Sequence, residues 1–375
     1  MKISVITGRF GISGVPLAQL RFARALSAYG HNVDYMIGYV NEGNKIPEIN
    51  SVNVYVFNKL RVSNMLIPLI HYFRREKPDI VFTAGDHLNA IVTLAVLISG
   101  SKTKISASSR VTPFDTYSNN IFSKGWVLKQ FTRALIPRIN ALTCVSKDMV
   151  EQYRQVFKNS PHVSVYNIIN DSISQKRMME PLDDEYILSA EEPIIIAAGM
   201  LEPWKGFNDL IMAMKELLKS RKAKLLILGE GSMRSELQEL IETLELKSVV
   251  KLAGHVENPL KYFKNADVFI LSSYVEGLPN VLVEAMMCGC TPVSTDCPTG
   301  PSEVLQDGKY GYLVPVKDPV SMAEAIVKAL DSPIAKSLLD EAIQPFSEDV
   351  VIKRHFEILG INDPDQNTDR LRIKN

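Results

Sequence analysis

The chain has 375 residues and a formal net charge of zero at pH 7, with 46% hydrophobic and 22% charged residues. This length exceeds what one hydrophobic core usually serves, and the composition is that of an ordinary globular protein, so we expect two soluble domains. The neutral charge balance gives no indication of a nucleic-acid partner.

We expect no export or membrane-spanning segment in this sequence. Residues 1–10 form a short apolar run without the long apolar region and cleavage site of a signal peptide. The longest apolar stretch, 88–100, is shorter than the roughly 18 residues of a spanning helix and reads as a buried helix. Three of the four cysteines lie between Cys288 and Cys297, with no histidine close in sequence, so we expect no metal site. A reducing cytoplasm is the expected compartment.

Strand and helix patterns alternate along both halves of the chain. This alternation predicts an α/β protein of two Rossmann-like, doubly wound parallel-sheet domains. The pattern opens with a strand at 2–7, a turn containing Gly8, Gly11 and Gly14, and a helix at 15–29. The later expected strands are 33–37, 52–57, 79–83, 104–107, 141–145 and 162–167, then 193–198, 224–228, 249–252, 267–271 and 311–314.

A polar, irregular stretch at 169–192 separates the two patterns and is the expected linker. The predicted domains are therefore residues 1–168 and 193–345. Residues 346–360 read as a last helix, and the polar tail 361–375 is expected to be disordered.

Two acids follow the predicted buried strand at 267–271. Glu276 lies in a loop with Gly277 and Pro279, and Glu284 lies on a helix over 281–287 with Asn280 as the expected N-cap. A helix that begins at the carboxyl edge of a strand offers free backbone N–H groups to a phosphate. Carboxylates beside a phosphate need hydrogen-bond donors, and sugar and ribose hydroxyls supply them. The segment therefore predicts a sugar-nucleotide site.

The segment EGLPNVLVEAM, the following TPVSTDCPTGP and the Asp307-Gly308 turn closely resemble the donor-binding segment of retaining glycosyltransferases of family 4, the glycosyl transferases group 1. The resemblance covers nearly the whole second half and the first half more weakly. It implies a GT-B fold, in which two Rossmann-like domains face each other across a cleft and the last helix packs back onto the first domain. It also implies sugar transfer from a nucleotide sugar with retention at the anomeric carbon, without a metal or other cofactor.

By this resemblance, Glu284 binds the ribose hydroxyls, and Glu276 contacts the donor sugar and stabilises the oxocarbenium-like transition state. The remaining residues on the donor side would hold the phosphates or meet the base. They are Gly14, Gly199, Gly277, Leu278, Pro279, Asn280, His255 and Val256. Packing alone is the alternative for His255, and a tight structural turn is the alternative for the loop at Gly14.

The stretch 199–206 is similar to the family's Gly-Arg-Leu-x-x-x-Lys-Gly loop, whose arginine and lysine clamp the donor diphosphate. Lys205 matches, but Met200 occupies the arginine position, so one cation of the clamp is missing. Arg110 ends a Ser-x-Arg sequence after the strand at 104–107 and could stabilise the leaving phosphate or bind an acidic acceptor. A salt bridge at the rim is the alternative for this arginine.

Asp86 and His87 follow the strand at 79–83 and are candidates for the acceptor side, with an N-cap aspartate and an ordinary histidine as the alternative. Residues 121–138 carry cations and no acid, interleaved with aromatic and aliphatic side chains. As a helix they would present a basic face and an apolar face, which suits peripheral contact with the anionic inner leaflet of the cytoplasmic membrane. A domain helix with a solvated basic face is the alternative.

The motif EGLPNVLVEA with STDCPTGP resembles bacterial polysaccharide-assembly enzymes that use UDP-linked hexoses or N-acetylhexosamines. We therefore expect a UDP-sugar donor and a lipid-linked or glycan acceptor in cell-surface polysaccharide synthesis. A GT-B-like sugar-nucleotide epimerase and a sugar-binding protein without chemistry are the alternatives. The Asp-Pro-Asp sequence at 363–365 lies in the polar tail and is interpreted as chance.

Overall fold

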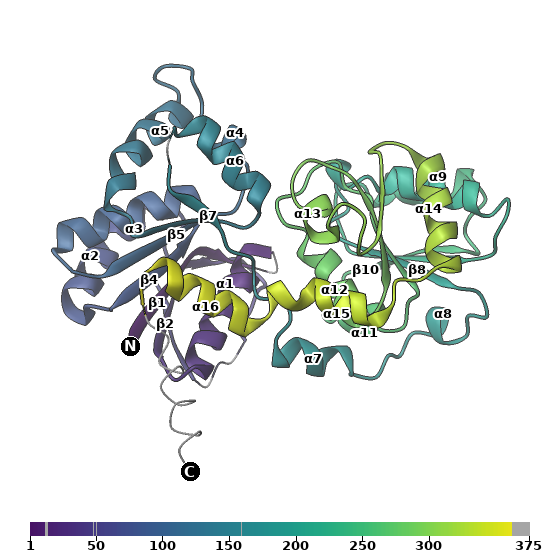
Figure 1. Ribbon diagram of the computed structural model, residues 1–375, viewed down its shortest axis with the longest axis horizontal. Helices are drawn as coiled ribbons and strands as arrows, with labels where there is room; N and C mark the ends of the chain where they lie inside the picture. The colour runs from purple at the N-terminus through teal and green to yellow at the C-terminus, as the bar shows by residue number, and fades with distance from the viewer. Residues whose placement is uncertain (12–13, 48, 50, 159, 362–375) are drawn as a thin grey trace, which may run out of the picture. The chain divides into compact units, whose positions relative to one another are not determined.

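The computed structural model describes residues 1–361 except 12–13, 48, 50 and 159. The chain forms two compact units (Figure 1). The first contains Met1–Ile168 and the helix that begins at Glu348, and the second contains Ile169–Ser347. Each unit has one parallel sheet with helices packed on its faces, so the α/β doubly wound fold class predicted from the sequence is confirmed.

The sheet of the first unit has seven parallel strands in the order β3-β2-β1-β4-β5-β6-β7. The strand order reverses between β1 and β4, and the loops that follow these two strands diverge there, where such sheets bind ligands. The strands are β1 Lys2–Phe10, β2 Asn32–Val40, β3 Val52–Val56, β4 Ile80–Ala84, β5 Lys104–Ser109, β6 Ala141–Cys144 and β7 His162–Ser164.

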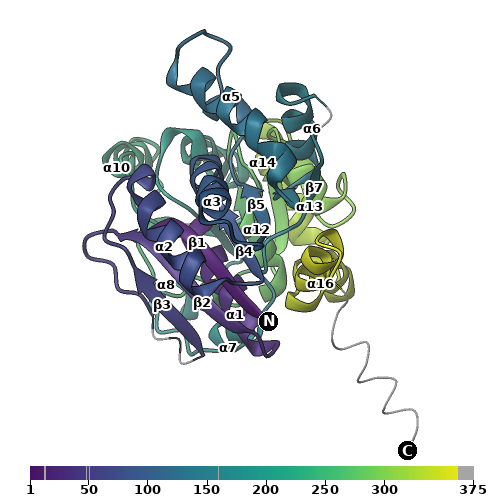
Figure 2. The ribbon, with the colours of Figure 1, turned by 90° about the vertical axis from the view of Figure 1, so that its left-hand side faces the viewer.

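Two apolar clusters cover the two faces of this sheet, because successive strand residues point to opposite sides. Ile3 and Val5 pack in one cluster, with α1 and α16, whereas Ile6 packs in the other, with α2 and α3. Figure 2 labels these four helices around the sheet. The helices are α1 Gly14–Ala28, α2 Leu66–Glu76, α3 Asp86–Ser99, α4 Pro113–Thr116, α5 Lys124–Leu135, α6 Lys147–Val156 and α16 Glu348–Ile358, with short 3-10 helices η1 Val62–Met65 and η2 Ile136–Arg138.

The sheet of the second unit has six parallel strands in the order β10-β9-β8-β11-β12-β13, and its order reverses between β8 and β11. The strands are β8 Ile194–Ala198, β9 Lys224–Leu228, β10 Val250–Gly254, β11 Val268–Leu271, β12 Thr291–Thr295 and β13 Tyr312–Val314. Strand β12 was not among the strands expected from the sequence, because its Thr-Pro-Val-Ser-Thr sequence is mostly polar. Its hydroxyls are satisfied by backbone, as Thr295 Oγ1 donates to Ser273 O (2.5 Å).

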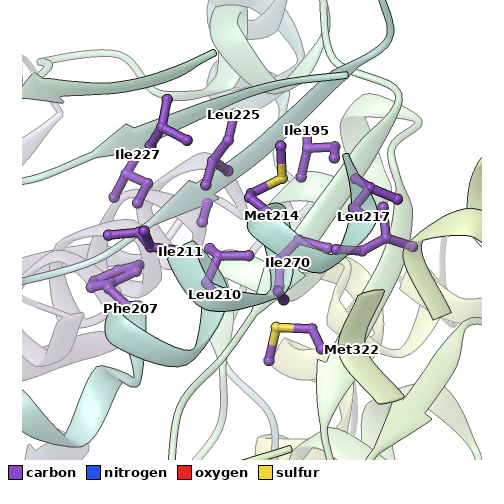
Figure 3. Packing of buried hydrophobic residues seen from close by; sticks show 14 of the residues in the cluster. Ile195, Phe207, Leu210, Ile211, Met214, Leu217, Leu225, Ile227, Ile270 and Met322 are labelled. Carbon is purple, nitrogen blue, oxygen red and sulfur yellow. The ribbon is translucent and has the colours of Figure 1, made fainter. Parts of the chain in front are cut away.

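Apolar side chains from α9 and α14 pack on the strands of the second sheet (Figure 3). Leu210 and Met214 of α9 lie with Leu225, Ile270 and Met322 in one buried cluster. The helices are α7 Ser172–Met178, α8 Glu185–Leu188, α9 Phe207–Leu217, α10 Arg234–Thr243, α11 Leu260–Phe263, α12 Asn280–Cys288, α13 Pro301–Leu305, α14 Pro319–Asp331 and α15 Lys336–Ile343, with 3-10 helices η3 Pro203–Lys205 and η4 Gln344–Phe346.

The stretch 169–192 carries α7 and α8 and groups with the second unit. Asn258 ties it to that unit, because its Nδ2 donates to Arg177 O (2.8 Å) and to Glu180 Oε2 (2.7 Å). Helix α16, which matches the helix expected at 346–360, packs on α1 in the first unit. The tail beyond residue 361, which includes the Asp-Pro-Asp sequence, lies outside the described residues.

Candidate active site

The loops that follow β8 and β11 lie against each other at the switch point of the second sheet. Gly206 makes this contact feasible, because it has φ +65° and a Cβ there would lie 2.1 Å from Ser272 O. Ser272 Oγ donates to Lys205 O (2.8 Å), and Tyr274 N donates to Trp204 O (2.8 Å). These bonds fix the backbone of the lysine beside the segment that carries the first glutamate.

Lys205 and Glu276 form an ion pair, with Nζ 2.5 Å from Oε1. Ser273 Oγ donates to the same carboxylate oxygen (2.6 Å). The lysine side chain is 17% exposed and the glutamate side chain 12%, so the charges attract more strongly than an exposed pair would. Nearby, burial and, secondarily, the charge of Glu276 raise the pKa of the Cys297 thiol to about 12, which keeps it protonated at neutral pH.

The segment Gly277–Pro279 is held at its backbone by the loop before α13. Gly300 has φ +95°, and a Cβ there would lie 2.6 Å from Pro279 Cδ and 3.0 Å from Gly277 O. Thr299 Oγ1 donates to the backbone carbonyl of Glu276. Leu278 and Pro279 are buried and Gly277 is half-buried. The glutamate therefore sits on a loop whose conformation is fixed from two sides.

Helix α12 begins at Asn280, with Pro279 as its N-cap and no side-chain cap. The predicted N-cap at Asn280 is wrong by one position, because Asn280 is already the first helical residue and Pro279, with ψ 80°, is the last residue outside the helix. Glu284 lies half-buried one turn further along the helix. Its charge helps to raise the pKa of Cys288 to about 12, although burial of the thiol is the larger cause.

The loop after β8 also packs backbone to backbone on the loop after β9. A Cβ at Gly229, which has φ +140°, would lie 1.8 Å from Gly199 O. Met200 is 57% exposed and places an uncharged side chain where the resembling family has arginine. At the end of β10, His255 is exposed and Val256 is half-buried.

In the first unit, Arg110 follows β5 and its Nη1 donates to Asn167 Oδ1. Burial lowers the pKa of its guanidinium to about 10, so the group keeps its charge at neutral pH. Among the described residues no carboxylate lies within ion-pair distance of it, which argues against the alternative of a rim salt bridge.

Asp86 is the first residue of α3, whose N-cap is Gly85, so the alternative of an N-cap aspartate is wrong. The aspartate is buried, and its two oxygens accept from Ser109 Oγ (2.6 Å) and Tyr153 OH (2.5 Å). Burial raises the pKa of this carboxyl. His87, the next residue, is exposed. The aspartate thus bonds to protein hydroxyls, whereas the histidine is open to solvent.

Gly14 is the first residue of α1 and is exposed. A Cβ at this position would meet nothing within 4 Å, so packing within the described structure does not require glycine here. Residues 12–13, which precede it in the predicted loop, lie outside the described residues.

The sequence reading missed Ser273 and Thr299, which bond directly to Glu276. The signal that could have found the serine is a Ser-Ser pair immediately after the buried strand β11, at the ligand-binding edge of a parallel sheet. Thr299 had no comparable signal, because its contact joins residues 23 positions apart.

A family model described as "Glycosyl transferases group 1" matches residues 179–344, which include both loops of the ion pair. An uncharacterized glycosyltransferase of Methanocaldococcus jannaschii is 31% identical over 296 residues, covering 71% of this chain and 73% of that protein. The chain belongs to the glycosyl transferases group 1. It is therefore a glycosyltransferase, as the resemblance predicted.

A second relative of this glycosyltransferase is an N-acetylgalactosamine-N,N'-diacetylbacillosaminyl-diphospho-undecaprenol 4-alpha-N-acetylgalactosaminyltransferase of Campylobacter jejuni. It is 33% identical over 244 residues, which cover 64% of this chain and 64% of that protein. Anabaena HepE, solved in complex with UDP, is similar with a TM-score of 0.75 at 17% identity, over 96% of this chain and 100% of that one. The predicted GT-B fold is confirmed.

No helix in the described part of the chain is long and apolar enough to cross a bilayer. The described residues also contain no group of three histidine, cysteine or acidic side chains arranged to hold a metal ion.

Proposed function

We propose that this glycosyltransferase moves a hexose or N-acetylhexosamine from a UDP-sugar to a lipid-linked or glycan acceptor, with retention at the anomeric carbon. The observation that carries the proposal is the contact of Lys205 with Glu276 at the switch point between β8 and β11. A cation and a carboxylate on adjacent loops can bind two different parts of the donor. The cation binds the diphosphate, and the carboxylate binds the sugar.

In this proposal the carboxylate of Glu276 accepts hydrogen bonds from the donor sugar and stabilises the positive charge that develops at the anomeric carbon. Lys205 neutralises the diphosphate as the bond to the sugar breaks. Because the lysine now bonds to the glutamate, donor binding has to draw its ammonium group at least partly toward the phosphates. Ser273 keeps the carboxylate in place during this exchange.

The nucleotide would be held by the elements around the ion pair. Glu284 on α12 is proposed to bind the ribose hydroxyls. The backbone around Leu278 and Asn280 is proposed to hold the phosphates, for which the Asn280 N–H would leave its hydrogen bond to Leu278 O (2.9 Å). Gly199, Gly277 and Pro279 shape this site, and His255 and Val256 at the end of β10 meet the base. We propose that no metal is needed, because Lys205 and the amino end of α12 supply the positive charge.

The diphosphate clamp lacks one cation, since Met200 is exposed and uncharged. In the first unit, Gly14 and Arg110 are the residues proposed to bind phosphate. A glycine at the start of α1 permits close approach of a phosphate to the helix N-terminus, and Arg110 is a charged group without a carboxylate partner among the described residues. Asp86 supports the segment around Arg110 through Ser109, and His87 remains the exposed candidate for the acceptor side.

The choice of donor and acceptor draws on the relatives. The Campylobacter jejuni relative is named for transfer of N-acetylgalactosamine to a saccharide on diphospho-undecaprenol, and the HepE structure contains UDP. We propose the same classes for this chain: a UDP-linked sugar, and an acceptor saccharide on a polyprenyl diphosphate, within cell-surface polysaccharide synthesis on the cytoplasmic side of the membrane.

A lipid-linked acceptor requires access to a membrane surface, and α5 with the loop before it is the proposed contact. In α5, Leu135 is buried, Trp126, Leu128 and Phe131 are half-buried, and Val127 is 53% exposed. Ile121 is 68% exposed and Phe122 85% exposed just before the helix. Lys124 and Arg133 add positive charge along it. This region is proposed to lie peripherally on the anionic leaflet.

A partition assay tests the function. The purified chain is incubated with radiolabelled UDP-sugars and a polyprenyl-diphosphate-linked sugar, and the label is followed from the aqueous to the organic phase. Transfer of label to the lipid supports the proposal, and retention of the anomeric configuration in the product supports its stereochemistry. A donor that changes its sugar without an acceptor, with all label remaining in water, would instead identify an epimerase.

A further inference from the structure

A small, partly open cavity of about 20 Å³ lies in the first unit. Four polar residues from four different parts of the fold line it: Gln19 of α1, Thr83 of β4, Arg110 after β5 and His355 of α16. At this cavity α16 therefore meets the segment that carries Arg110.

Each of these four residues has a buried polar atom without a hydrogen-bond partner among the described residues. The atoms are Gln19 Oε1, Thr83 Oγ1, Arg110 Nε and His355 Nδ1. Gln19, Thr83 and His355 are only 3%, 1% and 7% exposed, so solvent at the surface does not satisfy them. Buried polar atoms are rarely left unpaired in native proteins, and four around one cavity indicate a shared ligand.

The imidazole of His355 is fixed and uncharged. The rings of Phe22 and Phe82 pack against it with centroids 4.9 and 5.3 Å away. Burial, and to a lesser degree the charge of Arg110, lowers the pKa of this histidine to about 3. A neutral imidazole can donate or accept at Nδ1, so its polarity adapts to whatever occupies the cavity.

The donor and acceptor pattern of the cavity selects the kind of ligand. Arg110 Nε–H can only donate and Gln19 Oε1 can only accept, whereas the hydroxyl of Thr83 and the imidazole can do either. A water molecule both donates and accepts, and it needs roughly 10–15 Å³. An anion would accept from Arg110 but would face the lone pairs of the Gln19 oxygen. The pattern and the size therefore both favour water.

We propose that this cavity binds one ordered water that links Gln19, Thr83 and His355 to the guanidinium of Arg110 and fixes its orientation. With Asn167 bonded to Nη1 and the water bonded to Nε, the guanidinium plane is held at two corners. The three other residues are positioning residues, since they act on Arg110 through the water. Their effect on catalysis rests on the proposed role of Arg110, but the water itself does not.

The site is tested first by crystallography of the full chain at high resolution. We expect a single density peak within hydrogen-bond distance of Arg110 Nε, and we expect it to weaken or disappear in Thr83→Val, which keeps the shape and removes the hydroxyl. A cavity without density overturns the proposal. A bromide soak that places anomalous signal in the cavity also overturns it, since the ligand would then be an anion.

Thermal unfolding of matched variants tests the water in solution. Thr143→Val is the control, because Thr143 Oγ1 is also buried and unpartnered but the residue does not line the cavity. A hydroxyl that bonds to water stabilises the fold, whereas an unpaired hydroxyl does not. Thr83→Val should therefore unfold at a lower temperature than Thr143→Val. Equal or higher stability of Thr83→Val contradicts a bound water.

Steady-state kinetics tests whether the water positions Arg110 for sugar transfer. If Arg110 acts in transfer, Thr83→Val should lower the turnover number by about 2- to 10-fold, the effect of one hydrogen bond, without raising KM for the donor in proportion. Thr143→Val should leave it unchanged. If Arg110→Gln keeps full activity, the proposed role of Arg110 fails while the density and stability results still decide the cavity. Unchanged turnover in Thr83→Val alongside an inactive Arg110→Gln overturns the positioning role.

Discussion

The ammonium group of Lys205 lies 2.5 Å from the carboxylate of Glu276, although the two residues are 71 positions apart in the chain. Both come from loops at the carboxyl edge of one sheet, after the neighbouring strands β8 and β11. The proposed chemistry uses both charges, the carboxylate at the donor sugar and the ammonium at the diphosphate. In this structure the two groups contact each other.

Replacing Glu276 by Gln should remove most of the transferase activity, by about 10²- to 10³-fold, because the amide cannot stabilise positive charge at the anomeric carbon. The fold should survive, since Ser273 Oγ can still donate to the amide oxygen. Radiolabel transfer and circular dichroism measure the two effects. Glu257→Gln, at an exposed position outside the pair, is the control. Full activity of Glu276→Gln with an intact fold would remove the glutamate from the mechanism.

Replacing Met200 by Arg should strengthen donor binding. The side chain is 57% exposed on the loop that carries Lys205, so an arginine fits there and adds a second cation to the clamp. We expect the dissociation constant of UDP to fall by up to about tenfold, as one charge-assisted hydrogen bond allows. Isothermal titration calorimetry measures it, with Met200→Gln as the uncharged control. An equal gain from both variants would show that charge is not the cause.

Two glycines should respond oppositely to alanine. Gly206→Ala places a Cβ 2.1 Å from Ser272 O at a positive φ, so we expect loss of roughly 2–4 kcal/mol of unfolding free energy. Gly14→Ala meets nothing within 4 Å and should leave stability unchanged or slightly raised. If Gly14 approaches the diphosphate, the second variant still raises KM for the donor. Denaturant unfolding and steady-state kinetics separate these effects, and unchanged kinetics in Gly14→Ala would assign the glycine to the turn alone.

Among nucleoside diphosphates, UDP should stabilise the protein most. A ligand that binds only the native state at 100 times its dissociation constant adds about 2.7 kcal/mol. A thermal-shift series with UDP, GDP and ADP at equal concentrations, repeated with EDTA, measures the preference. The shift with UDP should persist in EDTA, because Lys205 and the start of α12 are proposed to hold the diphosphate. A larger shift with GDP or ADP would change the donor, and loss of the shift in EDTA would require a metal.

The chain should sediment with vesicles that contain anionic lipid and release as salt rises. Phe122→Ser together with Lys124→Glu should weaken this binding, because it removes an 85% exposed ring and reverses one adjacent charge. Each basic residue near such a surface contributes about 1 kcal/mol. The matched control is Ile67→Ser with Lys77→Glu, on α2 and directly after it in the same unit. Equal binding of both double variants would place the membrane contact elsewhere or exclude it.

The amino-acid sequence by itself determined the fold class and the family. The alternating strand and helix patterns predicted two doubly wound α/β units, because buried parallel strands and amphipathic helices leave different apolar periods in the sequence. The segment from Glu276 to Pro301 carried the family resemblance through its order of acids, glycines and prolines. The polar strand β12 escaped this reading, since its hydroxyls find backbone partners that only the folded chain brings near.

Tertiary structure alone decided which of the candidate residues touch. It paired Lys205 with Glu276 and added Ser273 and Thr299 to that site. It also buried Asp86, whose carboxylate accepts hydrogen bonds from two hydroxyl groups. These partners depend on which strands are neighbours and on where glycine lets two backbones approach, as at Gly206. Strand order is a property of the whole sheet, so no local stretch of sequence specifies it.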